Sequence, residues 1–553
     1  MNKGKVKTKI KINRPLGTRD IVPPASVTWS YVIDKIESIF RSYGYQRIIT
    51  PIIEKFELFA LRSGEEIRNR MFLIETPEEE LVLRPEITAS VCRVIASGQL
   101  TNMPLPYKFY YIDRCYRYER PQAGRYREFW QAGMELMGSS SPLADAEIII
   151  IASNILNQLG IHNFKLHIGH LAILRGYMED KKLTLDEQNA IIGQLDALGS
   201  DVSKLRLYIN SIKKSKGAVD KTMLVDIARK VIDMETFKED FRDKLAREGK
   251  KDLLKELELD SERKYWIYEI AETGKVAESD IPKIIELLED KIKDFVRIQK
   301  LIWSEVGISV TIENEIRTIK VPLEIAEKLV SLIDLVGDRE EVISAGKKLF
   351  SASSKALKAF EDFEVILDTL DELNIPYITD LSIARGLDYY TGMVFEIYIM
   401  ELGAQKQVCG GGRYDNLVSD FGGPNLPAVG FAMGLDRIIL AMDVLNVAIP
   451  PLPRADVYII PLDTSLVKTA QEIAERLRQE NINTELNLMS SKLKKALSLA
   501  SKLNVRFSII LGKAEAAENK LVVKDMVKEE QEVIPISEVV SRIKAGLGKG
   551  DKK

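Results

Sequence analysis

The sequence predicts an α+β protein, in which an antiparallel sheet is followed by a helical insertion and a small C-terminal α/β domain. Residues 45–138 and 382–418 carry alternating apolar and polar side chains broken by hairpin loops, which is typical of antiparallel strands. Between residues 175 and 375 charged side chains recur at helical spacing, and beyond residue 455 strand and helix patterns alternate. At roughly 150 residues per domain, 553 residues allow three or four domains.

The N-terminal elements follow from local patterns. Apolar residues from Trp29 to Tyr43 recur at helical spacing, and Gly44 stands where a helix C-cap is expected. Residues 45–59 are β-branched and apolar and predict a strand broken by Pro51. Residues 68–88 predict two strands around a turn at Thr76, and residues 107–138 predict a hairpin with a long loop at 121–126.

The later elements divide the chain into domains. Strand patterns return after residue 382, a helix is expected at 434–445, and the proline-rich stretch 446–455 is typical of a linker. Beyond it, the order β-α-β-α-β ends with a strand at 506–512. We therefore predict a first domain whose two parts are 1–175 and 376–445, a helical insertion at 176–375, and a C-terminal domain at 454–553.

Composition excludes several kinds of chemistry. The three cysteines form no CxxC pair, which argues against a disulfide scaffold or a cysteine zinc site and fits a cytoplasmic location. The three histidines lie at positions 162, 167 and 170 in a strand-like stretch, so no metal site is expected. No membrane span and no secretory signal are found. The net charge of −3 neither supports nor excludes a nucleic-acid partner.

Arginines dominate the hairpin at 107–138. Arg117 and Glu119 share one face if the strand is regular, and Phe129 lies on the returning strand. An arginine fork holds a phosphate with two hydrogen bonds, a carboxylate can accept from an exocyclic amine, and an aromatic ring can stack on a base. The alternative is a cross-strand ladder of ion pairs, and spacing alone does not decide between them.

Two further stretches follow in the second part of the sheet. Arg385 precedes Tyr389 and Tyr390, which strand alternation would send to opposite faces, and core packing is the alternative for both tyrosines. The glycine-rich stretch 410–434 lets the backbone approach a ligand closely but matches neither common nucleotide-binding loop. Arg437 lies one turn into the expected helix, where it is either a phosphate ligand or a surface residue.

Together, "RPEIT", "YRYERPQAGRYREFWQAGMELMG", "ARGLDYYTG" and "GGGRYDNLV…GFAMGLDR" resemble the motifs of the histidyl-tRNA synthetase family of class II aminoacyl-tRNA synthetases. The resemblance covers roughly residues 15–175 and 376–540. It implies that histidine and ATP form histidyl-adenylate and pyrophosphate, and that histidine is then transferred to the 3′ end of its tRNA. It also implies Mg²⁺ bound with ATP and a homodimer formed through the first helix and the strand at Pro51.

The resemblance also implies residue roles. Arg117, Arg385 and Arg437 would be catalytic and would hold the phosphates, while Glu119 and Phe129 would bind adenine. The histidine-binding residues would be Glu86, Ile87, Thr88, Arg117, Gln131, Glu135, Arg385, Tyr389 and Tyr390. Of the two tyrosines, Tyr390 is expected in the pocket, which requires a bulge or bend near Asp388.

The C-terminal domain resembles the family's anticodon-binding domain. Basic residues gather on its second helix and the following strand, as phosphate contacts require: Lys492, Lys494, Lys495, Lys502 and Arg506. A solvated lysine face is the alternative for each. Two other functions stay open, namely a synthetase for another amino acid and a catalytically inactive, synthetase-like regulatory subunit of ATP phosphoribosyltransferase. The latter proteins generally lack the anticodon domain and the catalytic arginines.

Overall fold

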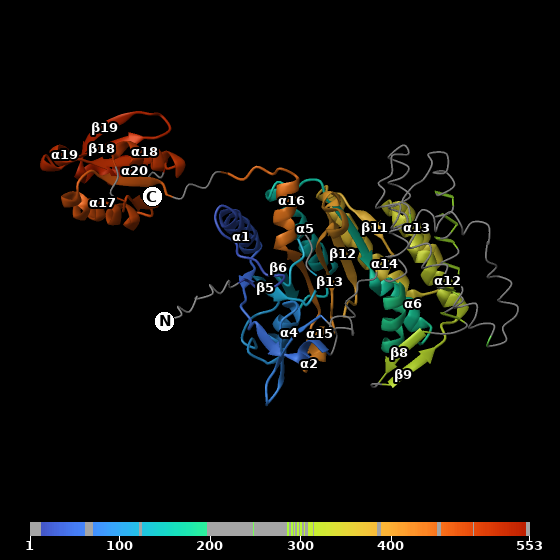
Figure 1. Cartoon of the computed structure of the whole chain (residues 1–553). Coiled ribbons are helices and arrows are strands. Elements are labelled where there is room, and N and C mark those ends of the chain that lie inside the picture. Colours follow the sequence, from blue (N-terminus) through green and yellow to red (C-terminus); the bar gives the residue numbers. More distant parts are fainter. Residues whose placement is uncertain are drawn as a thin grey trace. The chain divides into compact units, whose positions relative to one another are not determined.

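The computed structural model describes residues 13–60, 70–120, 124–195, 308–312, 315–383, 389–450, 455–489 and 492–548, with scattered residues between 247 and 304. The chain divides into two compact units, Met1–Val447 and Ala448–Lys553, which are described separately below (Figure 1). The division falls within the predicted linker. No helix in the described ranges is both long and apolar enough to cross a lipid bilayer.

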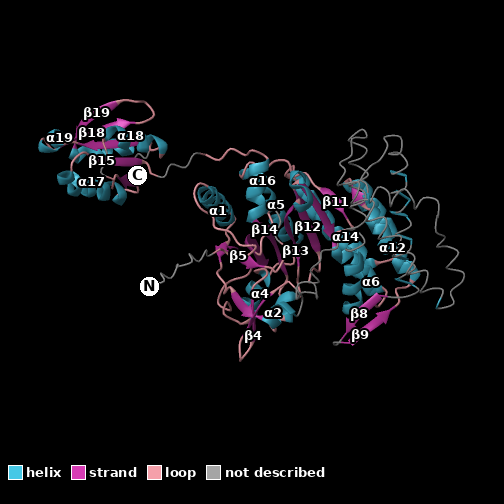
Figure 2. Cartoon of the chain, viewed as in Figure 1, coloured by secondary structure: helices cyan, strands magenta, loops and turns pink. Residues whose placement is uncertain are grey.

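A nine-stranded sheet forms the centre of the first unit (Figure 2). Its strands, in spatial order, are β1 (Gln46–Arg47), β5 (Tyr107–Tyr116), β6 (Glu128–Met137), β14 (Ala428–Gly434), β13 (Gln407–Arg413), β12 (Met393–Tyr398), β7 (Lys165–His170), β11 (Ile378–Asp380) and β10 (Val336–Gly337). Adjacent strands from β5 to β7 are antiparallel, which confirms the predicted α+β class. Near the edges, β1 runs parallel to β5 and β11 runs parallel to β7.

Strand alternation gives this sheet two different faces. Trp130 and Phe431 point toward α1 (Ala25–Ser42), where their rings lie 5.9 Å from Trp29 and 6.2 Å from Phe40. Helices α5 (Pro142–Gln158) and α14 (Ser354–Glu372) contact the sheet through β13, β14 and β7. Because successive side chains alternate, Phe129, Gln131 and Glu135 of β6 belong to the opposite face.

The N-terminal region confirms most local expectations. Helix α1 ends at Ser42, and Gly44 has a φ of 82°, as a C-terminal glycine requires. Strands β3 (Phe72–Glu75) and β4 (Glu80–Leu83) pair on either side of a turn, in which the Glu79 amide donates to Thr76 Oγ1 at 3.1 Å.

The strand predicted at 45–59 is only partly correct. Besides β1, residues Ile53–Lys55 form β2, which pairs with β4, but Phe56–Ala60 form helix α2. Phe56 and Phe59 are three positions apart, so a helical turn buries both rings toward α4 (Thr88–Ala96).

The described part of the predicted insertion is mainly helical. It contains the second half of α6 (Leu171–Asp180), then β8 (Ile308–Ile312), β9 (Glu315–Ile319), α12 (Leu323–Ser331), α13 (Arg339–Leu349) and α14. The last part of this range belongs to the same compact unit, because α14 packs on α5 and α6 and β10 is the edge strand of the main sheet. The domain boundaries drawn from the sequence stay predictions.

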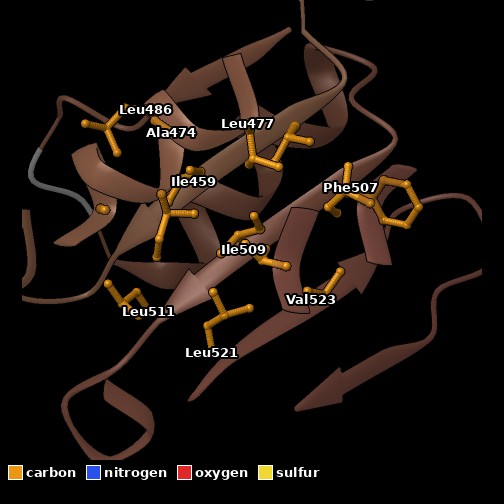
Figure 3. Packing of buried hydrophobic residues seen from close by; sticks show 14 of the residues in the cluster. Ile459, Ala474, Leu477, Leu486, Phe507, Ile509, Leu511, Leu521 and Val523 are labelled. Carbon is orange, nitrogen blue, oxygen red and sulfur yellow. The ribbon is translucent and has the colours of Figure 1, made fainter. Parts of the chain in front are cut away.

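The C-terminal unit is a five-stranded sheet with the order β16-β15-β17-β18-β19. Its elements are β15 (Val457–Pro461), α17 (Val467–Gln479), β16 (Thr484–Leu486), α18 (Leu493–Lys502), β17 (Phe507–Leu511), α19 (Lys513–Ala517), β18 (Lys520–Asp525), β19 (Gln531–Pro535) and α20 (Val539–Gly546). In this order β16, β15 and β17 run parallel to one another, whereas β18 runs antiparallel to β17 and β19 runs antiparallel to β18. Ile459, Leu477 and Phe507 belong to its own buried core (Figure 3).

Further elements of the described ranges are α15 (Leu417–Asp420), α16 (Leu435–Val444) and 3₁₀ turns at Leu332–Asp334, Met400–Gln405, Thr464–Leu466 and Ile536–Glu538.

Candidate active site

The floor of the candidate site is made of small residues on one face of the main sheet. The register pairs Gly412 with Gly430, and Gly430 with Glu135, so these positions share a face. A Cβ at Gly430 would overlap Glu135 Oε2, and one at Gly412 would lie 2.9 Å from Tyr390 Cδ1. The glycine-rich stretch therefore makes room for side chains of the site.

Glu135 lies at the centre of a buried polar cluster. Its Oε1 accepts hydrogen bonds from Thr88 Oγ1 at 2.7 Å and from Tyr111 OH at 3.1 Å, and its Oε2 accepts one from Tyr414 OH. Glu135 is fully buried, and burial raises its pKa to about 8 despite these donors. The sequence interpretation named neither Tyr111 nor Tyr414. The pairing of β5 with β6 would have indicated Tyr111, because it stands opposite Gly133.

The "RPEIT" residues lie at the start of α4, next to this cluster. Glu86 Oε1 accepts from the Ala89 amide at 3.0 Å, and burial raises the pKa of Glu86. Ile87 is buried, and Thr88 contacts Glu135 directly. Gln131, two residues before Gly133 on the same face of β6, accepts from Cys115 Sγ at 3.4 Å.

Both tyrosines of the "RGLDYYTG" stretch lie beside the cluster. Their ring centroids are 4.8 Å apart, and the Tyr389 ring packs on Tyr414 at 5.7 Å. Burial raises the pKa of Tyr389, with smaller effects from Tyr390, Glu86 and Glu135. Strand alternation does not separate the two rings, because both residues precede β12.

Which of these two tyrosines binds the substrate stays a prediction. Arg385 and the bend expected near Asp388 lie outside the described residues.

An arginine cluster lies where β5, β6 and α16 come together. Arg117 donates through Nε to the Pro85 carbonyl at 2.9 Å, and its guanidinium lies 5.2 Å from the Phe129 ring centroid. Burial lowers the pKa of Arg437, and the positive charges of Arg125 and Arg117 add to this effect. An anion is the group that such a concentration of positive charge favours.

Glu119 lies within the same cluster and forms an ion pair with Arg125. Burial acts to raise the pKa of Glu119, but the Arg125 hydrogen bond and nearby arginine charges bring it below its ordinary value. An ion pair of the kind that the cross-strand alternative predicts joins Arg114 of β5 to Glu128 of β6 at 3.7 Å, whereas Glu119 and Arg125 lie in the loop between these strands. The phosphate-binding roles of the arginines stay predictions.

The three histidines do not gather into one site. His162 is exposed, His167 Nδ1 lies 2.9 Å from Asp380 Oδ2, and burial lowers the pKa of His170 to about 3. Within the described ranges, no group of three or more His, Cys, Asp or Glu side chains is placed to hold a metal ion.

The basic residues predicted to bind tRNA differ in their surroundings. Lys492, Lys494, Lys495 and Lys502 are exposed at or on α18. Arg506 instead forms an ion pair with Asp525 at 2.7 Å and lies over the Phe507 ring, within the domain itself.

Comparison with known proteins decides the family. The histidyl-tRNA synthetase family model matches residues 17–262 and 270–438, and an anticodon-binding domain model matches residues 456–546. The chain belongs to the histidyl-tRNA synthetase family. The family match includes every motif of the first unit named above.

Relatives and solved structures of this family agree in length and fold. The histidine–tRNA ligase of Methanococcus aeolicus is 35% identical, over 95% of this chain and 99% of its own length. That of Methanocaldococcus jannaschii is 33% identical, over 96% and 99%. The crystal structure of histidyl-tRNA synthetase from Nostoc sp. PCC 7120 is 22% identical, with a TM-score of 0.59 over 97% of this chain and 100% of that chain, which shows a shared fold.

Proposed function

We propose that the chain is a histidine–tRNA ligase, which activates L-histidine with ATP and then transfers the histidine to its tRNA. The observation that carries this proposal is the arrangement of the buried Glu135 cluster and the arginine cluster along one antiparallel hairpin. A neutral imidazole carries one N–H donor and one acceptor, so a buried carboxylate and a tyrosine hydroxyl can satisfy both ring nitrogens.

The proposed chemistry is an in-line displacement. The carboxylate of histidine attacks the α-phosphorus of ATP, the bond to the β-phosphate oxygen breaks, and pyrophosphate leaves. We assign Arg117 to the α-phosphate and the substrate carboxylate, Arg437 to the γ-phosphate, and Arg385 to the α-phosphate. Glu119 and Phe129 are assigned to adenine, and Glu86, Thr88 and Gln131 to the substrate's α-amino group. Positioning and charge neutralisation then suffice without a protein nucleophile.

Mg²⁺ is proposed to arrive with ATP. The side chains around the phosphate site are mainly cationic, which fits a metal held by phosphate oxygens and water more than one held by a protein cage. Bound there, Mg²⁺ would offset the charge that moves onto the leaving pyrophosphate. Arg117 and Arg437 would orient the triphosphate beside it.

The C-terminal unit is proposed to bind the anticodon stem and loop of histidine tRNA. Four exposed lysines on or next to α18 supply positive charge at the surface of this unit. Arg506 is a weaker candidate, because Asp525 already holds it. A cytoplasmic location stays a prediction from the unpaired cysteines.

We also propose a homodimer formed through α1 and the segment around Pro51. Ile49, Ile52 and Ile53 are exposed in this segment, with Ile49 75% exposed. Contiguous exposed apolar side chains mark an interface. Sedimentation at micromolar concentration should give twice the chain mass, and the paired change Ile49→Glu and Ile53→Glu should shift it toward the monomer. A monomeric native protein would contradict the proposal.

The regulatory-subunit alternative is not favoured. The relatives named above are ligases over nearly their whole length, and the anticodon-binding domain is present. Arg117 and Arg437 are both present as well.

Amino-acid-dependent exchange of pyrophosphate into ATP tests the function and separates it from a synthetase for another amino acid. Histidine should support exchange at a rate far above every other amino acid in a full panel, and the same preparation should charge histidine tRNA. Exchange with another amino acid and none with histidine would overturn the proposal, and exchange with none would favour the regulatory alternative.

A further inference from the structure

The segment Tyr389–Thr391 carries both tyrosines of the site but belongs to no strand or helix. Its position therefore depends on contacts from other elements. On one side it is tied to β13 and the residues that follow, because the Thr391 amide donates to the Arg413 carbonyl at 2.8 Å and the Asp415 amide donates to Thr391 Oγ1 at 3.0 Å.

Arg175 ties the same segment to a different element. Its Nε donates to the Tyr390 carbonyl at 3.2 Å, and its Nη2 donates to Asn189 Oδ1 at 2.9 Å. Arg175 lies on α6, more than 200 residues earlier in the chain, and only 7% of it is exposed. It belongs to none of the sequence motifs assigned to the site.

A cavity of about 370 Å³ lies beside this contact. It is lined among others by Arg175, Gln188, Tyr389, Thr391 and Asp415. Atoms that face a cavity lack packing partners on that side, so dispersion forces hold the segment less firmly there. The directional hydrogen bond from Arg175 therefore adds a constraint on the Tyr390 backbone beside this cavity.

Hydrogen bonds satisfy part of the buried guanidinium. The cavity beside it is lined by both acidic and basic side chains, among them Asp415 and the ion pair of Glu179 with Lys355. A planar guanidinium can donate to two acceptors in fixed directions, here the carbonyl of Tyr390 and the amide oxygen of Asn189.

We propose that Arg175 is a positioning residue for histidine recognition, because its hydrogen bond to the Tyr390 carbonyl fixes the tyrosine ring against the histidine pocket. The proposal rests on the assignment of Tyr390 to that pocket. Displacement of a recognition group by about 1 Å weakens binding strongly even when no contact to the ligand is removed. Other residues are assigned to ATP, so the affinity for ATP should not depend on Arg175.

Steady-state pyrophosphate exchange by the full chain tests whether Arg175 affects the binding of histidine but not that of ATP. Arg175→Met should raise the histidine KM about tenfold, the effect of losing one hydrogen bond to a charged donor, and leave the ATP KM within about twofold of wild type. Arg175→Lys keeps the charge but not the two-directional fork, so its histidine KM should lie between those of wild type and Arg175→Met. Asn189→Leu removes only the second hydrogen-bond acceptor of Arg175, so it should raise the histidine KM by less than Arg175→Met does.

Lys355→Ala is the matched control. Lys355 also lines the cavity, but its amino group pairs with Glu179 at 2.7 Å instead of with the tyrosine segment. Its histidine KM should equal that of wild type. Thermal unfolding of each variant establishes that the kinetics are measured below the unfolding transition. If Arg175→Met does not fold, Arg175→Lys and Asn189→Leu decide the question.

A double-mutant cycle with Tyr390→Phe distinguishes the possible failures. The combined variant Arg175→Met and Tyr390→Phe should be less impaired than the product of the single effects, because a displaced ring has already lost the contribution of its hydroxyl. Independent effects, or equal losses in the KM values for histidine and ATP, would overturn the positioning role. A normal Arg175→Met beside an impaired Tyr390→Phe would refute only that role, whereas a normal Tyr390→Phe would refute the pocket assignment itself.

Discussion

At the scale of single residues, the site contains a buried carboxyl group whose hydrogen-bond donors lower the free-energy cost of its burial. Glu135 is fully buried and has three hydroxyl donors around it. Even so, burial raises its pKa to about 8. A group held in this way is suited to specific recognition, because a ligand without a matching polar atom leaves it unpaired.

Replacing Glu135 with glutamine tests this role. The amide keeps the size of the side chain but replaces one of its two oxygens with an NH2 group that cannot accept a hydrogen bond, so the histidine KM in pyrophosphate exchange should rise about 10- to 100-fold. The ATP KM should change little. Glu147→Gln provides the control, because Glu147 pairs with Lys108 and Tyr45 on the helix side of the sheet. An unchanged histidine KM in Glu135→Gln would remove Glu135 from the pocket.

At the scale of elements, the glycines of β13 and β14 have a packing role. They lie where side chains from neighbouring elements occupy the space of a Cβ, as Glu135 does at Gly430 and Tyr390 does at Gly412. Gly412 and Gly430 are paired across the two strands, so their lack of a side chain leaves room for Glu135 and Tyr390.

The variant Gly430→Ala tests this packing role. The added methyl group overlaps Glu135 Oε2, so Glu135 must move and histidine-dependent exchange should fall at least tenfold, with a loss of about 1–3 kcal/mol in stability from overpacking. Gly193→Ala is the matched control, because no atom of the described ranges lies within 4 Å of a Cβ there. A Gly430→Ala protein with wild-type kinetics would show that the floor tolerates bulk.

At the scale of the whole molecule, the chain contains two units that each have their own core. The C-terminal sheet and its helices bury their apolar residues internally, with Val457, Phe507 and Leu521 fully buried there. The residues assigned to histidine and ATP all lie in the first unit. We therefore expect chemistry at the site and the proposed recognition of the anticodon to be separable.

Removal of residues 454–553 should consequently affect the two half-reactions unequally. Histidine-dependent pyrophosphate exchange should stay within a few-fold of wild type, whereas the kcat/KM for charging tRNA should fall by about 100-fold or more, because phosphate contacts supply much of the affinity for nucleic acid. Parallel assays on the same preparation measure both. Equal losses would instead show that the C-terminal unit supports the active site structurally.

Several features were determined by the sequence alone. Local periodicity located α1, the hairpin of β5 and β6, and the alternating strands and helices of the C-terminal unit, because each is defined by neighbours in the chain. The motifs indicated the family and the class of reaction. The strand prediction is wrong at residues 56–60, because a short apolar run fits a strand or a helix equally well. The packing of this segment against α4 favours the helix, and that contact cannot be read from the local sequence.

Tertiary structure alone decided which residues meet. Tyr414 reaches Glu135 across 279 positions in the chain, and Arg175 reaches Tyr390 across 215. No local period records such a contact, because it depends on strand register and on how helices pack against the sheet. The sequence indicated the class of reaction, whereas the fold determined which side chains lie close enough to one another to take part in it.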